Sequence, residues 1–470
     1  MAQKASISKD KTYDWITLSV FFSLVTIGWF MVYAVLHDPA HPYAFLDFGT
    51  LLGAQTVWVV LSIFTFIAVL VIDWKFWNAL TFPIYGITML LLIMVLIIGK
   101  EINGARAWFA IGPFSMQPSE WAKFGTALAV SSYLSFFKSS TMNSKVVLVS
   151  MALFISPALL ILLQPDFGSA LVYFSFFILL YRRGQSPWVI ISGIGLAAVF
   201  ILSLLFGPLH VTSFLLLLGF AVYVLDLEKP KNAVISISAV LLIMVFMLFQ
   251  DEKTNVIIPP SLAFLVYLYR ELKKKNIKIV SLITSLIIVA SSFGFMATYV
   301  FDNVLKPHQQ ERINVWLAPE KCDPRGSLYN ILQAKMAIGS GGLTGKGFLQ
   351  GEMTKLDYVP EQETDFIFTS IGEEQGFVGI LGVIFLFTVL LTRCIIIAER
   401  ANLEFIRNYG YAVAGILFFH FLFNIGMTMG LLPVVGIPLP FISKGGSSLI
   451  AFSIMVAVLV KLDMARYRAN

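Results

Sequence analysis

The chain has 470 residues, of which 58% are hydrophobic and only 13% are charged, and its mean hydropathy is +0.83. A soluble protein of this length needs more charge to cover its surface, so the composition excludes an ordinary soluble protein and indicates an integral membrane protein. We attribute the net charge of +6 to basic loops beside anionic lipid, and it gives no reason to propose nucleic-acid binding.

Apolar runs recur along the whole chain, and most are long enough to cross a hydrocarbon core of about 30 Å as helices. They predict an all-α polytopic bundle of about fourteen transmembrane helices in a single membrane domain, residues 1–470. The runs are Trp15 to Leu36, Thr50 to Ile72, Asn78 to Ile98, Ser119 to Phe137, Val146 to Leu163, Ser169 to Tyr181, Trp188 to Phe206, Val211 to Leu225, Ala233 to Phe249, Val256 to Tyr269, Ile279 to Val300, Phe366 to Ile397, Tyr411 to Leu432 and Leu449 to Val460.

Basic residues are concentrated in alternate loops, as at Arg182 and Arg183 and again at Lys229 and Lys231. Lys and Arg in short loops stay on the cytoplasmic side, so we expect both termini in the cytoplasm of a multi-pass inner-membrane protein. This orientation places the polar stretch Asp302 to Asp365 outside the cytoplasmic membrane.

The stretch Asp302 to Asp365 is the one long polar interruption of the sequence. Long loops of this kind are commonly functional, so we interpret it as the extracytoplasmic catalytic loop. An amphipathic pattern predicts one short helix inside it, with Ser327 as N-cap and Gly339 as its C-terminal stop. The glycine run from Gly339 to Gly347 lacks the spacing of a P-loop. We therefore interpret it as a close backbone approach to a ligand or to helices.

Asp365 is the strongest catalytic candidate, because it is a carboxylate at the start of an apolar span. It could simply favour the positive end of a helix. However, Glu361, Glu363, Glu373 and Glu374 crowd the same stretch. Neighbouring carboxylates beside lipid raise one another's proton affinity, which suits a general base.

Other charged residues occur near the predicted outer ends of spans, where an ionisable group is a functional candidate. Glu120 and Lys123 are spaced to share a helix face and could form a structural ion pair instead. Asp166 could be only a helix cap. Arg106 could be only an interfacial anchor.

Lys444 lies between Ser443 and Ser447 at the start of the last span. Hydroxyls, glycine amides and a lysine at a helix N-terminus could seat a phosphate group, and a simple helix cap is the alternative. His420 and Asn424 share one face of the preceding span, and we favour an interhelical hydrogen-bond pair over catalysis for them.

Taken in order, six motifs resemble the RodA/FtsW (SEDS) family. They are Asn103–Trp108, Gln117–Lys123, Gln164–Ala170, Gln333–Gly347, Pro360–Phe368 and Ser443–Ser448. The stretch Lys306–Ile313 looks more like RodA than FtsW. The family core has about ten spans, so this chain carries about four more, and we place them between residues 188 and 270.

The resemblance implies a peptidoglycan glycosyltransferase that polymerises lipid II at the outer membrane face for cell elongation and shape. It also implies a class B penicillin-binding protein as partner. The family's essential acid matches Asp365. Its other motif residues match Arg106, Glu120, Lys123 and Asp166.

Our hypothesis is an inverting transfer in which Asp365 takes the proton of a sugar hydroxyl and undecaprenyl pyrophosphate leaves. Arg106, Lys123, Arg312 and Lys444 are candidates to hold the pyrophosphate. No nucleotide is needed, and a divalent cation could assist although no ligand set for it is visible. The alternatives are a lipid II flippase or transporter, and a non-enzymatic scaffold.

Overall fold

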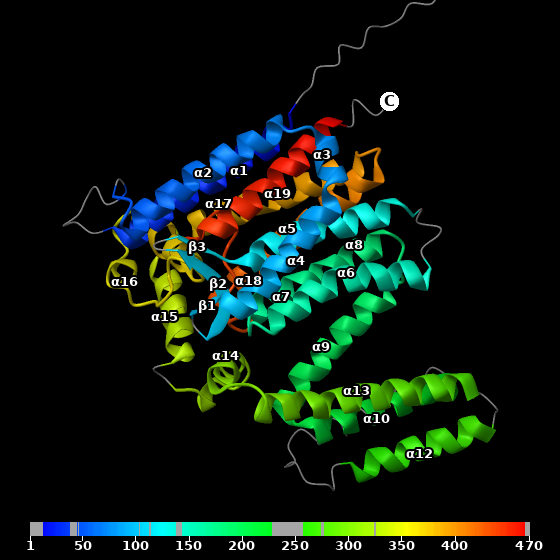
Figure 1. The fold of residues 1–470 in the computed structure, drawn as a ribbon. Helices are drawn as coiled ribbons and strands as arrows, with labels where there is room; N and C mark the ends of the chain where they lie inside the picture. The colour runs from blue at the N-terminus through cyan, green and yellow to red at the C-terminus, as the bar shows by residue number, and fades with distance from the viewer. Residues whose placement is uncertain are drawn as a thin grey trace, which may run out of the picture. The chain divides into compact units, whose positions relative to one another are not determined.

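The structure is a computed structural model that describes residues 13–37, 45, 47–102, 104–111, 114–137, 143–227, 257–273, 277–323 and 326–465 (Figure 1). Its contacts group the chain into two compact units. Unit 1 comprises residues 1–186 and 324–470, and unit 2 comprises residues 187–323. The predicted insertion, residues 188–270, falls within unit 2, whereas the predicted loop Asp302–Asp365 is divided between the units.

Unit 1 contains most of the helices and a small antiparallel sheet of order β1-β2-β3. Its elements are α1 (Trp15–Leu36), α2 (Leu51–Val71), α3 (Trp74–Ala79), α4 (Thr81–Ile98), β1 (Lys100–Ile102), β2 (Ala105–Ile111), β3 (Phe114–Met116), α5 (Pro118–Ser135), α6 (Ser144–Leu162), α7 (Phe167–Leu171), the 3-10 helix η3 (Val172–Ser175), α8 (Phe176–Arg182), α15 (Ser327–Ser340), α16 (Glu352–Lys355), α17 (Ile367–Glu399), α18 (Glu404–Thr428) and α19 (Gly446–Ala465).

Unit 2 is helical throughout its described residues. Its elements are α9 (Trp188–Phe206), α10 (Pro208–Leu227), α12 (Ile258–Lys273), α13 (Ile277–Asn303), α14 (Pro307–Leu317) and the 3-10 helix η5 (Pro319–Lys321).

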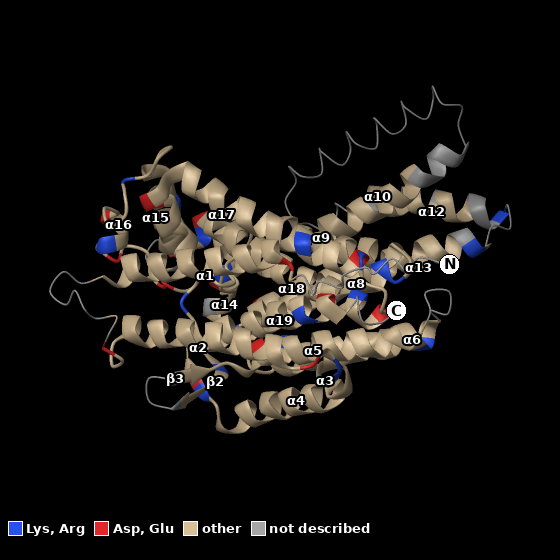
Figure 2. Ribbon diagram, turned by 90° about the horizontal axis from the view of Figure 1, so that it is seen from above, with Lys and Arg blue, Asp and Glu red and all other residues tan. Residues whose placement is uncertain are grey.

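Within the described residues, nine helices are long and apolar enough to cross a membrane: α1, α2, α4, α6, α9, α13, α17, α18 and α19. Every predicted apolar run that falls on described residues is helical, which confirms a polytopic helical membrane protein. The run Ala233–Phe249 lies outside the described residues. Helices α2 and α4 carry no Lys, Arg, Asp or Glu along their whole length, as lipid-facing helices require (Figure 2).

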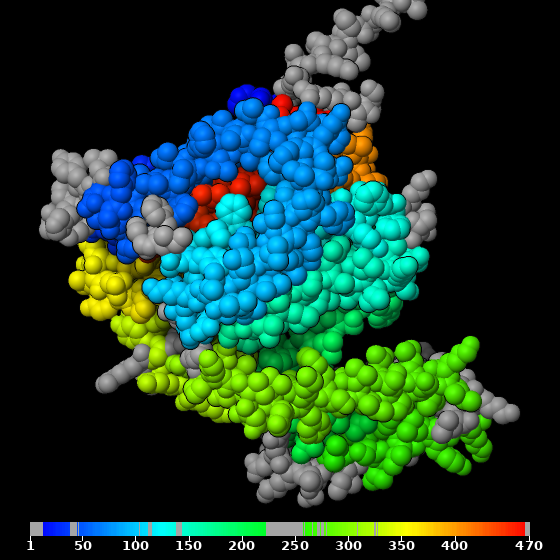
Figure 3. Space-filling view, in the orientation of Figure 1, coloured from blue at the N-terminus to red at the C-terminus, as the bar shows by residue number. Residues whose placement is uncertain are grey.

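The core of unit 1 is α19, which other helices surround. Of its most apolar stretch, 78% is buried inside the protein, against 22% for α4. In the space-filling view the middle of α19, coloured red, is seen through a gap between the blue and cyan helices (Figure 3). Its small and branched residues pack against α2, α5 and α18, so the C-terminal helix holds the bundle together.

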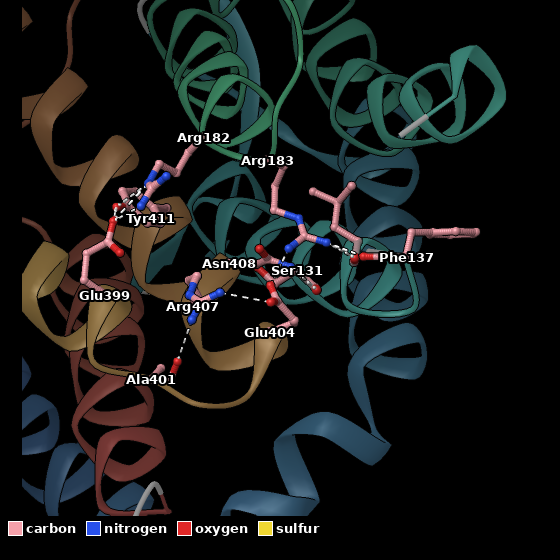
Figure 4. A network of polar contacts seen from close by, with 11 residues as sticks. Ser131, Phe137, Arg182, Arg183, Glu399, Ala401, Glu404, Arg407, Asn408 and Tyr411 are labelled. Carbon is pink, nitrogen blue, oxygen red and sulfur yellow. Dashed lines mark hydrogen bonds and ion pairs between the residues drawn. The ribbon is translucent and has the colours of Figure 1, made fainter. Parts of the chain in front are cut away.

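A polar network closes one end of this bundle (Figure 4). Arg183 is only 3% exposed. It donates a 2.9 Å hydrogen bond to the Leu134 carbonyl and pairs with Glu404. Arg407 also reaches Glu404, at 2.9 Å, and donates to the Ala401 carbonyl at 3.0 Å. These bonds join the ends of α5, α8 and α18, where the backbone groups would otherwise lack partners.

Helix α17 is broken at Gly376, whose φ of 64° and ψ of −162° are not helical. The glycine run fits into this break and replaces the missing helical hydrogen bonds. The bonds are Lys346 N to Glu373 O (3.0 Å), Gly347 N to Glu374 O (2.9 Å), Phe377 N to Gly342 O (2.9 Å) and Val378 N to Leu343 O (3.1 Å). No water is available in the bilayer core, so an interrupted helix needs such partners.

The approach of the two backbones requires glycine. A Cβ atom added at Gly345 would lie 2.0 Å from the Glu374 carbonyl oxygen, and one at Gly341 would lie 2.0 Å from that of Gly372. The prediction of a close backbone approach is confirmed, and the partner is a helix of the same chain.

The short predicted helix exists as α15, but its ends differ from the prediction. Its N-cap is Gly326, without a side-chain cap, and its C-cap is Gly341. The prediction of Ser327 and Gly339 was wrong, because Gly326 occupies the N-cap position before Ser327 and the helix continues past Gly339 to Ser340. The polar stretch also contains α14, which the sequence reasoning missed because its apolar face is short.

We expect Gly345→Ala and Gly376→Ala to lower the free energy of unfolding by at least about 1–3 kcal/mol each, because a methyl group would separate the two backbones. The apparent melting temperature of the purified protein measures this. Gly382→Ala is the matched control on α17, since a Cβ atom there meets nothing within 4 Å. Equal melting temperatures for all three variants would contradict the role of the break.

Candidate active site

Asp365 stands in a tight turn directly before α17. The backbone amides of Thr364, Asp365 and Phe366 all donate to the Glu361 carbonyl, at 3.2, 3.1 and 3.2 Å. Glu361 takes a left-handed φ of 58°, which the turn imposes on it. Asp365 itself is half-buried. The turn therefore fixes the backbone of this carboxylate where the polar loop meets the helix bundle.

The buried side chain of Asn424 holds this turn against the bundle. Its Nδ2 donates to the Asp365 carbonyl at 2.8 Å and to the Ile437 carbonyl at 2.8 Å. Both hydrogens of the amide are thus used. One side chain of α18 joins the Asp365 turn to the segment that precedes α19.

Lys123 and Glu120 form the predicted ion pair, with Nζ and Oε1 2.7 Å apart and both side chains fully buried. Lys123 Nζ also lies 2.8 Å from Nε2 of His420. The other ring nitrogen of His420 lies 3.0 Å from the Pro438 carbonyl, which can only accept. Nδ1 therefore carries the proton, and Nε2 accepts from Lys123.

His420 and Asn424 share a helix face, as predicted, but each makes its hydrogen bonds to other segments. Their partners are two consecutive carbonyls, those of Pro438 and Ile437. His420 contacts Lys123 of α5, so the predicted interhelical role is confirmed for His420, whereas Asn424 bonds only to backbone carbonyls outside helices. In addition, this face of α18 places the Asp365 turn and the buried Lys123 in one connected group.

Asp166 caps α7 by accepting a 3.0 Å hydrogen bond from the Ser169 amide, so its predicted capping role is confirmed. Its second oxygen accepts from Nε2 of Gln117 at 2.8 Å. The backbone amide of Gln117 in turn donates to Oγ of Ser447 at 3.1 Å. Gln117 thereby ties the starts of α5, α7 and α19 together.

Lys444 is bound to the acidic loop by two contacts. Its Nζ lies 3.0 Å from Oε1 of Glu363, and its backbone amide donates to the Glu363 carbonyl at 2.8 Å. The Lys444 side chain remains 21% exposed. Its neighbour Ser443 is buried and accepts from the Leu439 amide at 2.8 Å, which closes the turn before α19.

Two of the four glutamates that crowd the sequence around Asp365 have lysine partners in the structure. Glu363 pairs with Lys444, and the fully buried Glu373 pairs with Lys346 at 2.8 Å. The two lysines offset the charge of these two glutamates, whereas the buried carboxylate oxygens of Glu374 have no hydrogen-bond partner among the described residues. The lysine pairs could not be predicted because both lysines lie far away in the sequence. That the crowding raises the proton affinity of Asp365 stays a prediction.

Glu373 also connects the break in α17 to the Asp365 turn. It accepts from the Thr354 amide at 2.9 Å and from the Thr354 hydroxyl at 2.7 Å. The Thr354 carbonyl accepts from Nε2 of Gln362 at 2.8 Å. Gln362 is 2% exposed and belongs to the turn. The chain of contacts thus runs from the buried helix to Asp365.

Two other predicted site residues lie on elements outside this group. Arg106 is exposed on β2, opposite Glu101 of β1. Arg312 lies on α14, in unit 2. Their predicted roles in holding substrate stay predictions.

The hydrogen bonds of Gln117 and Lys444 bring the N-termini of α5, α19 and α17 to one place. Helix N-termini carry partial positive charge and unpaired amides, which favour an anion. Lys444 adds a partly exposed cation that is bound to Glu363, and Asp365 provides a carboxylate in the same turn as Glu363. This end of the bundle can bind a diphosphate and accept a proton. Among the described residues, no three His, Cys, Asp or Glu side chains form a metal-binding group.

Sequence reasoning missed Gln117, Glu363 and Gln362 as members of the site and gave Asn424 no link to Asp365. Gln117, Glu363 and Asn424 bond to groups far away in the chain, whereas Gln362 bonds to the nearby Thr354 carbonyl. Such bonds leave no spacing pattern. The only available signal was that Gln117, Gln362 and Glu363 fall within the motifs quoted above.

We expect Lys123→Met to lower the free energy of unfolding by about 3–5 kcal/mol, because it leaves Glu120 buried without its counter-charge. The double variant Glu120→Gln/Lys123→Met removes both charges, so it should recover much of that loss. Thermal unfolding of the purified variants measures both. A double variant less stable than Lys123→Met would contradict the pairing.

The chain was compared with known proteins. A family model described as a cell cycle protein, named for FtsW, RodA and SpoVE, matches residues 14–218 and 216–468. The peptidoglycan glycosyltransferase RodA of Treponema pallidum is 30% identical over 456 residues, which cover 96% of this chain and 97% of the relative. The peptidoglycan glycosyltransferase MrdB of Escherichia coli K12 is 30% identical over 82% of this chain and 77% of its own.

Solved structures show the same relationship. One chain of a peptidoglycan synthase complex, in work on the coordination of polymerization and crosslinking, matches with a TM-score of 0.64 and 26% identity, covering 97% of this chain and 99% of that chain. The rod shape determining protein RodA of Thermus thermophilus shares the fold, with a TM-score of 0.55 and 23% identity over 97% and 98% of the two chains. The chain described here belongs to the FtsW/RodA/SpoVE family.

Proposed function

We propose that this chain polymerises lipid II, the undecaprenyl-pyrophosphate-linked precursor, into glycan strands at the outer face of the cytoplasmic membrane for cell elongation and shape. Membership in the family makes it a peptidoglycan glycosyltransferase, as its relatives are named. The observation that carries the proposal is that Lys444, at the start of α19, is bound to Glu363 in the turn that carries Asp365, where three helix N-termini meet.

In the proposed reaction, Asp365 accepts the proton of a sugar hydroxyl of the acceptor. The hydroxyl oxygen bonds to the anomeric carbon of the donor, and the bond from that carbon to the pyrophosphate oxygen breaks. The leaving diphosphate keeps the electron pair. A general base in this position contributes about 10²–10⁴-fold to the rate.

The leaving diphosphate is stabilised by the amides of the helix N-termini and by Lys444, which is exposed enough to reach it. Lys123 is fully buried, so it contributes its charge from beneath the site while its partners Glu120 and His420 hold it. Ser443, Ser447 and Asp166 fix the turns at the starts of α7 and α19. A role of Arg106 or Arg312 in holding the diphosphate stays a prediction.

An apolar groove supports a lipid-linked substrate. It lies between α1 and α17, has a volume of about 470 Å³, and is lined by residues such as Phe30, Met31 and Ile371. Gly379 and Gly382 widen it by leaving out side chains. Because α17 begins two residues after Asp365, an isoprenoid chain in this groove would bring its diphosphate to the same end of the bundle.

We also propose a protein partner for the chain and its orientation in the membrane. A solved neighbour comes from a peptidoglycan synthase complex, which supports a class B penicillin-binding protein as partner. Both termini lie in the cytoplasm and Asp365 lies outside, as the positive charge of alternate loops indicates. A requirement for a divalent cation stays a prediction.

Purified protein supplied with lipid II should form glycan polymer, and Asp365→Asn should reduce the rate by about 10²–10⁴-fold because the proton acceptor is lost. Gel analysis of the glycan products measures this, with the melting temperature as the control for folding. Translocation of lipid II without any polymer would instead identify a flippase. Polymer formation at the normal rate in Asp365→Asn would remove Asp365 from its role.

We expect Asn424→Leu to reduce kcat by about tenfold or more with little change in KM, because the Asp365 turn loses its anchor and misplaces the base. Asn408→Leu is the matched control. Asn408 is an equally buried asparagine of α18 that donates to a backbone carbonyl, that of Ser131, at 3.2 Å. It lies near the other end of the helix. Equal losses of activity in both variants would show a general effect on stability and contradict the positioning role.

A further inference from the structure

Unit 2 contains a cavity of about 510 Å³ that the proposed reaction does not use. It lies where α9 ends and α10 begins, and residues in the last turns of α13 and α14 also line it. Gln310 of α14 donates to the Phe301 carbonyl at 2.6 Å, which holds α14 across the end of α13. The volume falls within the range of ligand-binding sites.

One part of the cavity wall carries negative charge. The lining residues Leu204, Phe301 and Leu317 lie in the last turns of α9, α13 and α14. The last carbonyls of a helix lack intrahelical partners and carry partial negative charge. Asp302 lines the same cavity and adds a full negative charge. Three helix C-termini and a carboxylate together favour a cationic group that can donate hydrogen bonds.

Positive charge is also present in the cavity wall. Lys321 lines the cavity, and the N-terminus of α10 opens at Gly207 and Pro208. Among the ion pairs of the described residues, neither Lys321 nor Asp302 takes part in one. A simple anion would be repelled by Asp302, and a simple cation by Lys321. A zwitterion satisfies both.

A buried hydroxyl provides a second observation that points to a ligand. Ser203 is 1% exposed, and its Oγ has no hydrogen-bond partner within the described structure. A polar atom taken out of water normally has a partner. Ser203 lines the cavity together with Asn314, so a bound polar group would supply the missing bond.

The surroundings of the cavity are apolar. Leu205 and Phe206 in its wall are 43% and 38% exposed. Only 11% of the most apolar stretch of α9 is buried inside the protein, so α9 faces lipid. A ligand at the end of such a helix meets the boundary between headgroups and acyl chains.

We propose that this cavity binds the headgroup of a zwitterionic phospholipid with a primary ammonium, such as phosphatidylethanolamine. The ammonium is received by Asp302 and the helix C-termini, and the phosphate by Lys321. The acyl chains lie along the exposed apolar surface of α9. The site is separate from Asp365, so it does not depend on the proposed reaction.

The test uses the full chain purified from an equimolar mixture of phosphatidylethanolamine, phosphatidylcholine and phosphatidylglycerol, with retained lipid measured by native mass spectrometry. Phosphatidylethanolamine should be retained about tenfold over the other two. Asp302→Asn should shift retention toward the anionic phosphatidylglycerol, and Lys321→Gln should reduce retention of phosphatidylethanolamine about tenfold. Glu320→Gln and Lys306→Gln change exposed charges of the same region outside the cavity wall and should change nothing.

Equal retention of the three lipids by the unaltered chain would overturn the proposal. Equal lipid retention by the cavity variants and their control variants would also overturn it. O-phosphoethanolamine carries the same charges without acyl chains. If it bound as tightly as the lipid, the ligand would be a soluble phosphate ester and the assignment to a lipid would be wrong. Asp302 and Lys321 are exposed, so their variants should keep the melting temperature of the unaltered chain.

Discussion

A transmembrane helix that stops bonding to itself must find new partners, because lipid offers none, and the rest of this structure depends on how α17 meets that constraint. The glycine run from Gly339 to Gly347 enters the break at Gly376 and takes over its hydrogen bonds. Through this contact, part of the polar stretch Asp302–Asp365 packs against the helix bundle in a fixed position. The Lys346–Glu373 pair, Thr354 and Gln362 then extend the same connection to the turn that carries Asp365.

Two lysines of the candidate site follow a similar rule, because each pairs with a carboxylate and also joins separate segments of the chain. Lys123 joins α5 to α18 through Glu120 and His420. Lys444 joins the start of α19 to the acidic loop through Glu363. The pairs limit the cost of burial and at the same time hold three helix N-termini together. An anion-binding end of the bundle is therefore a consequence of how the charges are paired.

The opposite end of α18 is closed by the arginine network around Glu404 (Figure 4). Glu404 and Asn424 lie about 30 Å apart along the helix axis at 1.5 Å per residue, which is about the thickness of a hydrocarbon core. Polar contacts thus concentrate at the two levels where a membrane protein meets water.

Much of this could be predicted from the sequence, and the reasons are local. The apolar runs predicted the helices because lipid permits few other structures. The spacing of Glu120 and Lys123 predicted their pairing, and the position of Asp166 predicted its cap. The break at Gly376, the anchor from Asn424 to the Asp365 carbonyl and the Lys444–Glu363 pair could not be predicted, because each joins segments that are distant in the sequence and most involve backbone atoms. The sequence placed additional helices at residues 188–270, within unit 2, but it did not predict that unit 2 extends to Asp323, because that boundary follows from contacts between helices.

The central claim is that Asp365 must be ionised to accept a proton during glycan transfer. The most direct measurement is the dependence of the polymerisation rate on pH, for the unaltered chain and for Asp365→Asn. A general base stops working when it is protonated, so the rate of the unaltered chain should fall on the acid side, and the slow residual rate of the variant should lack that fall. An identical acid-side fall in both proteins would show that another group accepts the proton.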